Sequence, residues 1–177
     1  DYQVVTLSKE TEEGRQTRKL VLAKDLVELF CEKSGMSVEA IDREFKGSEL
    51  EGLEAQHPFL DRTSKLITAD FVTTDSGTGA VHIAPGHGAD DYQAGRQNDL
   101  GILSPVDDHG KYTEECGIPE MVGHHVFDCN GPIIGLVKKA GRLLAKETYR
   151  HSYPHCWRSK TPIIFRAVEQ FFISLDG

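Results

Sequence analysis

The stretch that most constrains this sequence is residues 77–92, which read Gly77-Thr78-Gly79-Ala80-Val81-His82-Ile83-Ala84-Pro85-Gly86-His87-Gly88-Ala89-Asp90-Asp91-Tyr92. It contains four glycines, two histidines and two adjacent carboxylates. The order of these residues predicts a loop, a short strand, a second loop and the start of a helix. Glycine lets the backbone approach a ligand closely, and small-molecule sites are often built from loops beside a helix N-terminus. These residues are therefore the first candidates for a functional site.

The length and the net charge of the chain limit the number of domains and the kinds of partner that it is expected to have. At 177 residues the chain is long enough for one domain with a sizeable core. Its net charge is −8 and its isoelectric point is about 5.5. Proteins that attract nucleic acid by their own positive electrostatic potential carry clustered Lys and Arg instead. Any contact with nucleic acid is therefore expected to be local or shared with another part of a larger protein.

The cysteines and the apolar residues indicate a soluble, cytoplasmic protein. The four cysteines form neither a Cys-x-x-Cys pair nor the spacing of a disulfide framework, as is typical of a reducing compartment. No apolar run approaches the roughly 18 residues that span a bilayer, and no secretion signal opens the chain. Residues 1–7 and 171–177 both read as strand patterns and the first residue is not methionine, so both ends are predicted to be internal boundaries of a longer polypeptide.

Hydrophobic periodicity predicts a mixed α/β domain that is barrel-like, with peripheral helices. A hairpin is expected from strands at 2–7 and 18–22 joined by a charged loop at 8–17, followed by a helix at 24–33 that ends before Gly35. Residues 111–128 are expected to be irregular with short strand segments. The other expected elements are a helical turn at 37–41, strands near 42–47, 66–72, 102–103, 143–149, 163–167 and 171–173, helices at 90–100 and 132–139, a loop around 57–59 and a turn at 107–110.

Residues 77–92 resemble the signature of the editing (CP1) domain of class I aminoacyl-tRNA synthetases, most closely that of the bacterial isoleucyl enzymes. In the family pattern, the valyl and leucyl enzymes share the Gly-Thr-Gly-Ala-Val opening without the His-x-Ala-Pro-Gly that follows here at 82–86, which favours the isoleucyl branch. A second block, from His151 to Arg166, resembles the segment where this insertion returns to the catalytic body. The resemblance implies an editing domain over residues 1–150, lacking the family's N-terminal threonine-rich strand, and a return segment over residues 151–177.

The resemblance also implies a reaction and its partners. One methylene in an apolar pocket gives only about 1 to 3 kcal/mol of discrimination, as isoleucyl-tRNA synthetase itself illustrates, so a second site must remove misactivated valine. The implied reaction is hydrolysis of the ester of mischarged Val-tRNA(Ile) at the tRNA(Ile) 3′ end, with valyl-adenylate as a further implied substrate. The editing domain uses no cofactor, whereas ATP and Mg belong to the synthetic site of the parent enzyme, which ligates isoleucine to tRNA(Ile). The rest of the parent synthetase chain is the other implied partner.

The same resemblance assigns the candidate site residues. Asp91 would hold the α-ammonium group of the misacylated amino acid, and His82 would border the side-chain pocket and help to exclude the isoleucyl group; these two are the catalytic candidates. The remaining candidates bind substrate: Gly77, Thr78, Gly79 and Ala80 as the floor for the terminal adenosine, and Pro85, Gly86 and His87 as the second loop. In this family the pocket positions a water molecule with help from a free ribose hydroxyl, so His82 is not assigned as the general base.

Each candidate also has a simpler interpretation that the residues leave open. Adjacent carboxylates favour the first turn of a helix through the macrodipole, which is the simpler reading of Asp90 and Asp91. The simpler reading of His82 is a buried histidine whose ring nitrogens form hydrogen bonds with the backbone. The glycines at 77 and 79 suit a tight turn, while the absence of a third glycine excludes a dinucleotide-binding fingerprint.

Two groups of ligand-type residues raise the question of a metal. The first is His82, His87, Asp90 and Asp91, and the second is His151, His155 and Cys156. Neither group has the compact spacing of a structural zinc site. Some relatives carry Cys-x-x-Cys in the return segment, but here Ser159 stands in place of the second cysteine. No metal is therefore predicted. Three alternatives stay open: an editing domain of the valyl type, a truncated module that binds the tRNA end without turnover, and a metal-dependent hydrolase.

Overall fold

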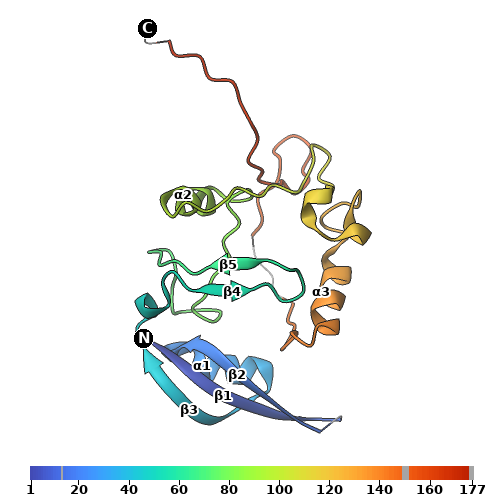
Figure 1. Cartoon of the computed structure of the whole chain (residues 1–177). Coiled ribbons are helices and arrows are strands. Elements are labelled where there is room, and N and C mark those ends of the chain that lie inside the picture. Colours follow the sequence, from blue (N-terminus) through green and yellow to red (C-terminus); the bar gives the residue numbers. More distant parts are fainter. Residues whose placement is uncertain (13, 149–151, 176–177) are drawn as a thin grey trace. The chain divides into compact units, whose positions relative to one another are not determined.

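A computed structural model describes residues 1–12, 14–148 and 152–175, and these form two compact units. The first unit consists of Asp1–His82 with Leu136–Thr148, and the second of Ile83–Gly135 with the described part of residues 149–177. Strands and helices both occur, which confirms the mixed α/β class (Figure 1). Residue 149 of the predicted strand 143–149, His151, and the predicted boundary between residues 150 and 151 lie outside the described residues.

The first unit is built on a long antiparallel hairpin. Strands β1 (Tyr2–Thr11) and β2 (Gly14–Ala23) pair in continuous register from Tyr2↔Ala23 to Thr11↔Gly14. The predicted hairpin is confirmed, but the predicted loop at 8–17 is wrong because the ladder continues through most of it. The Thr11 hydroxyl donates to the Gly14 carbonyl oxygen over 2.6 Å at the last pair of the ladder. Charged residues are accommodated because this end of the ribbon is exposed to solvent.

Strand β3 (Ser37–Phe45) pairs antiparallel with the other edge of β1, so the sheet order is β2-β1-β3. The helical turn predicted at 37–41 is therefore wrong, and the strand predicted near 42–47 begins earlier than expected. All residues of β3 except Phe45 are exposed, so its sequence carries no alternation of buried and exposed positions from which to recognise a strand. Its conformation is fixed by pairing with β1.

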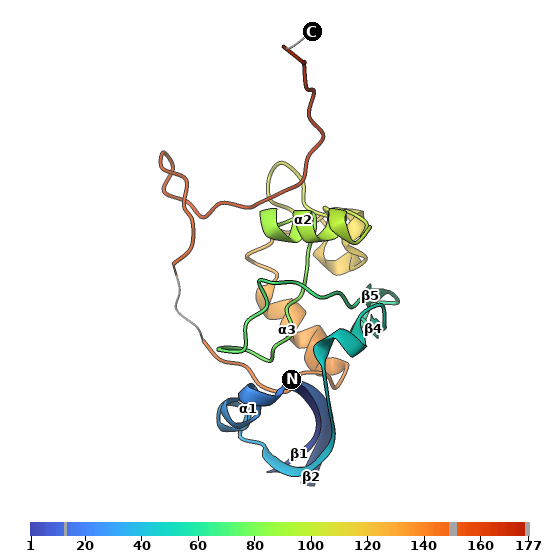
Figure 2. The ribbon, with the colours of Figure 1, turned by 90° about the vertical axis from the view of Figure 1, so that its left-hand side faces the viewer.

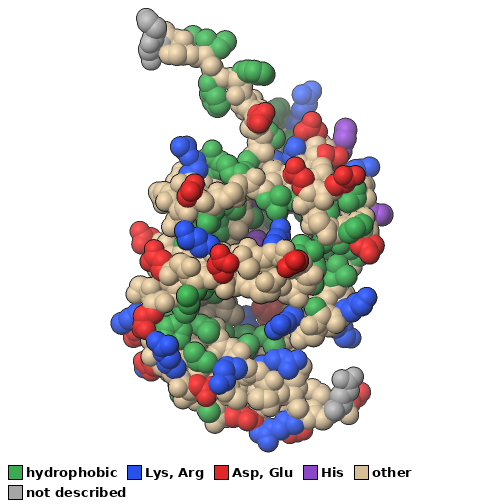
Figure 3. Space-filling model, viewed as in Figure 1, with side chains coloured by type: hydrophobic (Ala, Val, Ile, Leu, Met, Phe, Trp, Pro, Cys, Tyr) green, Lys and Arg blue, Asp and Glu red, His purple; other side chains and the backbone are tan. Residues whose placement is uncertain are grey.

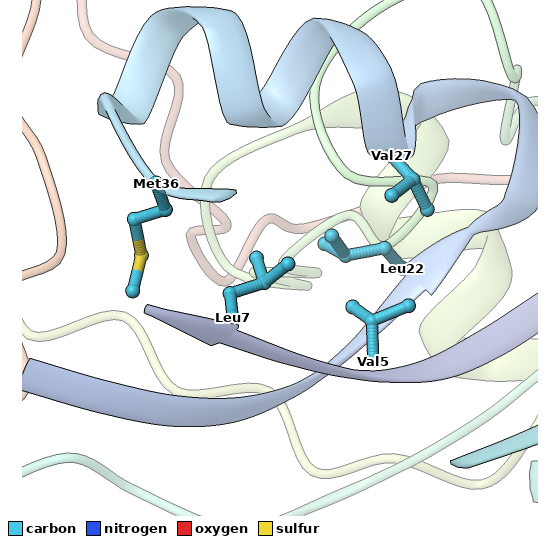
Figure 4. Packing of buried hydrophobic residues seen from close by; sticks show 5 residues of the cluster. All are labelled: Val5, Leu7, Leu22, Val27 and Met36. Carbon is cyan, nitrogen blue, oxygen red and sulfur yellow. The ribbon is translucent and has the colours of Figure 1, made fainter. Parts of the chain in front are cut away.

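One face of this sheet is covered by α1 (Val27–Ser34), as Figures 1 and 2 show. A 3₁₀ turn (Lys24–Leu26) leads into the helix, and Gly35 ends it with a left-handed φ of 67°. The predicted helix and its glycine stop are confirmed. The core between helix and sheet consists of Val5, Leu7, Leu22, Val27 and Met36 (Figure 4).

Truncating Leu7 to alanine is expected to lower the free energy of unfolding of the first unit by about 2–5 kcal/mol. Leu7 is fully buried, so the substitution removes its transfer free energy and leaves a cavity. Chemical denaturation followed by circular dichroism measures the change. Leu53→Ala is the matched control, because the Leu53 side chain is 54% exposed and its truncation should change stability little.

The remaining elements are short and are joined by long irregular segments. A second antiparallel pair, β4 (Glu54–Gln56) with β5 (Thr63–Lys65), follows a 3₁₀ turn at Gly47–Leu50. The later elements are α2 (Ala89–Gln97), 3₁₀ turns at Glu114–Cys116 and Pro119–Met121, and α3 (Asn130–Lys139). The helices predicted at 90–100 and 132–139 are confirmed with shifted ends, and residues 111–128 are irregular with isolated bridges as predicted.

Several predicted strands are wrong because they have no partner. In the described structure, residues 66–72, 102–103, 163–167 and 171–173, the described part of 143–149 and the short strand expected within 77–92 join no ladder of the two sheets. A strand exists only where another strand satisfies its backbone groups. The described strands form one three-stranded and one two-stranded sheet, and neither closes into a barrel. No helix among the described residues is long and apolar enough to cross a membrane.

Candidate functional site

The first part of the motif is a tight turn held against the end of the β1–β2 hairpin. Gly77 and Gly79 both have left-handed φ values, of 74° and 79°. The Ala23 N–H donates to the Thr78 carbonyl over 2.9 Å, and the Tyr2 hydroxyl donates to the Gly79 carbonyl over 2.6 Å. A Cβ at Gly79 would lie 2.4 Å from the Ala23 Cβ. The turn therefore requires these glycines for structural reasons alone.

The residues that follow this turn are open to solvent. The Thr78 hydroxyl contacts the backbone of Ala80, with its oxygen 3.3 Å from both the nitrogen and the carbonyl oxygen. Ala80 and His82 are exposed. His82 is therefore not a buried histidine of the core, and its imidazole is accessible to a ligand.

His57 is a further histidine of the first unit, in the loop that the sequence predicts around residues 57–59. Its Nδ1 accepts hydrogen bonds from the backbone N–H groups of Phe59 (3.3 Å) and Leu60 (2.9 Å), and its ring contacts Phe59 edge to face at 4.7 Å. Burial lowers the pKa of His57, and the charges of Arg62 and His82 lower it further. The His57-Pro58-Phe59 sequence was the available signal, because a histidine before such a turn can accept the amides that follow it.

The lowered pKa of His57 predicts a pH-dependent stability in this turn. The unfolded chain protonates His57 as the pH falls below about 6.5, whereas the folded chain resists because burial, with the charges of Arg62 and His82, lowers the pKa of the imidazole. Stability from this group is thus complete above pH 6.5 and declines as the pH falls below it. The denaturation midpoint measured on either side of pH 6.5 tests this.

His57→Asn is the control for that measurement. The asparagine side chain keeps an acceptor for the Phe59 and Leu60 amides but does not titrate. The difference in stability between wild type and His57→Asn should therefore shrink or reverse as the pH falls. An unchanged difference across pH 6.5 would contradict the role given to the imidazole.

In the second unit, Asp91 lies in the first turn of α2. Gly88 precedes the helix in an extended conformation, and the Ala84 N–H donates to Asp91 Oδ2 over 3.1 Å. Asp91 is half-buried whereas Asp90 is exposed. The described residues donate no hydrogen bond to Asp91 Oδ1, so this oxygen can accept a hydrogen bond from a ligand. Asp91 is thus both a structural link between loop and helix and a carboxylate with spare acceptor capacity.

The loop between Ala84 and α2 is clamped from two sides. The His87 N–H donates to the Ala84 carbonyl over 2.8 Å, and His87 Nδ1 lies 2.9 Å from the Phe165 carbonyl oxygen. Gly86 is buried, and its carbonyl accepts the Ala167 N–H over 2.7 Å. These contacts give the second loop a definite structural role.

A groove of about 1200 Å³ lies within the second unit, between α2 and residues 165–169. Pro85 and Gly86 line it, but Asp91 does not. The face of α2 that borders the groove therefore differs from the face that carries the candidate carboxylate.

The candidate residues are thus divided between the two units. Those of the first unit are Gly77, Thr78, Gly79, Ala80 and His82, and those of the second are Pro85, Gly86, His87 and Asp91. Within each unit the motif forms a compact turn anchored by backbone hydrogen bonds. Among the residues that the structure describes, no group of three or more His, Cys, Asp or Glu side chains could hold a metal ion.

Comparisons with known proteins agree with the motif. A family model described as "Leucyl-tRNA synthetase, editing domain" matches residues 4–123. The isoleucine–tRNA ligase of Persephonella marina is 51% identical over 158 residues, which cover 89% of this chain and 16% of that protein. The isoleucine–tRNA ligases of Desulfotalea psychrophila and Thermotoga maritima are 47% and 46% identical, over 89% and 99% of this chain.

The chain spans less than a fifth of the length of these relatives, from 16% to 18%. The resemblance to isoleucyl-type editing domains is confirmed by these matches. Because the family model covers residues 4–123 of 177, the chain belongs to the aminoacyl-tRNA synthetase editing-domain family that this model describes.

Proposed function

We propose that this chain is the post-transfer editing domain of an isoleucyl-tRNA synthetase and hydrolyses the ester of mischarged Val-tRNA(Ile). The observation that carries the proposal is the half-buried carboxylate of Asp91, which binds the Ala84 amide through Oδ2 within a motif typical of this family. The isoleucine–tRNA ligase names of the relatives support the choice of amino acid. The parent enzyme would ligate isoleucine to tRNA(Ile) with ATP.

Asp91 would bind the α-ammonium group of the valyl ester. An aspartate carboxylate is negatively charged at neutral pH, and a charge-assisted hydrogen bond to an ammonium group is about twice as strong as a neutral one. The N-terminus of α2 further stabilises a negative charge in its first turn. The Ala84 N–H orients the carboxylate through Oδ2, which leaves Oδ1 for the substrate.

The other candidate residues would shape the pocket. The turn at Gly77–Ala80 offers backbone groups to the terminal adenosine, and exposed His82 would border the valyl side chain. A water molecule would attack the ester carbonyl carbon, and the bond from that carbon to the ribose oxygen would break. The ribose oxygen takes a proton, and valine and free tRNA leave. The water is positioned with help from the neighbouring ribose hydroxyl.

Size would give the pocket its selectivity. The synthetic site separates isoleucine from valine by only about 1 to 3 kcal/mol, since they differ by one methylene. A second pocket that admits valine but excludes the larger isoleucyl group multiplies this discrimination. His82 is the residue proposed to make that exclusion.

We propose the following setting for the domain. Residues 1–150 form the editing domain, which is barrel-like within the longer synthetase, and residues 151–177 lead back toward the catalytic body. The domain needs no cofactor or metal, and its partners are the tRNA(Ile) 3′ end, the misactivated valine and the rest of the synthetase chain. Four free cysteines support a reducing, cytoplasmic setting.

Deacylation of Val-tRNA(Ile) and Ile-tRNA(Ile) tests the proposal. The 177-residue chain is compared with a longer version that includes the threonine-rich strand of its relatives. Valine-selective release by the longer protein is the expected result, with weaker release by the shorter one. Faster release from Thr-tRNA(Val) would favour the valyl type, and release abolished by a chelator would favour a metal-dependent hydrolase. Binding of the tRNA end without release would identify a non-catalytic module.

A further inference from the structure

Residues 152–163 form a narrow loop in the second unit (Figure 2), and none of them is a candidate for the editing site. Its two arms are joined by backbone hydrogen bonds from the Ile163 N–H to the Pro154 carbonyl (3.2 Å) and from the Cys156 N–H to the Thr161 carbonyl (2.9 Å). At the tip, the Lys160 N–H donates to the Cys156 carbonyl over 2.9 Å. The loop is therefore a preorganised turn, which lowers the entropic cost of presenting its side chains to a partner.

The loop presents exposed aromatic side chains. Trp157 at the tip is 82% exposed and Tyr153 in the first arm is 41% exposed. The Tyr153 ring lies 6.3 Å from the His155 ring and 6.4 Å from the ring of Phe127, which is 42% exposed. Large apolar rings exposed together usually mark an interaction surface.

The charge of the loop is opposite to that of the whole chain. Residues 152–163 include Arg158 and Lys160 but no Asp or Glu, whereas the chain carries a net charge of −8. Both cations are exposed and flank the tip. Figure 3 shows acidic and basic side chains interspersed over the visible face of the molecule, with no broad cationic field. A cationic aromatic loop is therefore a local feature.

We propose that the loop at residues 152–163, together with Phe127, binds single-stranded nucleic acid. Bases stack on aromatic rings regardless of their sequence, and flanking cations contact the phosphates. A protein partner fits less well at Lys160, because lysine is depleted at protein interfaces, whereas a phosphate accepts readily from it. The inference rests on the proposed function in one respect, namely that the natural strand would be an unpaired tRNA 3′ end, held away from the acyl group.

Trp157 is the only tryptophan in the chain, so its fluorescence reports on this loop alone. Titration with a short single-stranded RNA that ends in CCA should quench this fluorescence saturably at low salt. Trp157→Ala should weaken binding of the same RNA, labelled and followed by anisotropy, by about 5- to 150-fold, the range expected for loss of one base stack. Trp157→Phe should retain most of the affinity because it keeps a ring.

The salt dependence separates a phosphate contact from a general charge effect. Arg158→Gln should reduce the slope of log affinity against log salt by about 0.7, the value for one phosphate contact on a single strand. Arg142→Gln is the matched control, since Arg142 is an exposed arginine of the first unit. Its loss should leave the slope unchanged. Equal slopes for the two variants would overturn the proposal.

Two further outcomes would also overturn it. One is the absence of saturable quenching. The other is a blue shift of Trp157 emission with rising protein concentration and no response to RNA, which would identify a protein contact. The RNA carries no aminoacyl group, so binding is measured independently of hydrolysis. Failure of deacylation with Trp157-dependent RNA binding would refute the proposed function and leave the loop assignment standing.

Discussion

Replacing Asp91 by alanine is expected to lower kcat/KM for Val-tRNA(Ile) deacylation about 10- to 100-fold. The variant removes the carboxylate proposed to hold the substrate ammonium, and a hydrogen bond to a charged group is worth about 1.5–3 kcal/mol. Each 1.36 kcal/mol of lost transition-state stabilisation costs a factor of about ten in rate. Deacylation by the longer protein that contains the threonine-rich strand is the measurement.

Two companion variants separate the ammonium contact from a structural role. Asp91→Asn keeps an oxygen that can accept the Ala84 N–H, so the loop stays joined to α2, but it carries no charge. It should lose activity as severely as Asp91→Ala, while its stability falls by only about 0.3–1 kcal/mol, which is what the lost charge contributes through the helix dipole. Asp90→Ala removes an exposed carboxylate from the same turn. It should cost about 0.3–1 kcal/mol of stability through the helix dipole and leave deacylation intact.

The variants also decide between the two interpretations of the adjacent aspartates. If both act only through the helix dipole, Asp90→Ala and Asp91→Ala should behave alike in the deacylation assay. Undiminished valine release by Asp91→Asn would remove Asp91 from the site.

Features that depend on neighbouring residues could be predicted from the sequence. The turn at 107–110 is an example, because Asp107 Oδ1 accepts the N–H groups of His109 (2.8 Å) and Lys111 (2.9 Å) and Gly110 takes a φ of 72°. The end of α1 at Gly35 and the start of α2 beside Asp90 and Asp91 follow from the same local chemistry. Each of these choices is decided within a few residues.

Features that depend on a distant partner could not be predicted. Residues 37–41 pair with β1, and nothing in their own composition distinguishes that strand from a helical turn. Residues 163–167 have strand-like composition, yet Ala167 donates to an isolated carbonyl at Gly86 and no ladder follows. Strand formation is a property of two segments, so one segment alone does not determine it.

The candidate site divides in the same way. The turn at Gly77 and Gly79 follows from its glycines, but its anchoring by Tyr2 and Ala23 involves residues more than fifty positions away. Local chemistry alone would leave Asp91 as a helix-start carboxylate. Its proposed ammonium contact came from the family motif.

Replacing Gly86 by alanine should be among the most destabilising single changes in the second unit. A Cβ at this position would lie 2.1 Å from the Leu103 carbonyl oxygen, 2.8 Å from the Leu103 carbonyl carbon and 3.1 Å from Ser104 Cα. All three are backbone atoms, so no side chain can rotate away to make room. Overpacking typically costs about 1–3 kcal/mol and occasionally more, and a backbone clash belongs at or above the upper end.

Chemical denaturation of the 177-residue chain and hydrogen exchange of the α2 amides measure the effect. Gly101→Ala is the matched control, because a Cβ there meets nothing within 4 Å and its stability should change little. Gly86→Ala should speed exchange in α2, because the displaced loop leads directly into that helix. It should also speed exchange at Ala167, whose N–H donates to the Gly86 carbonyl. Equal stability of the two variants would show that the second loop can shift to accommodate the added Cβ without a loss of stability. Loss of editing in Gly86→Ala would then report a pocket contact, whereas loss accompanied by unfolding assigns Gly86 to the scaffold that holds Asp91.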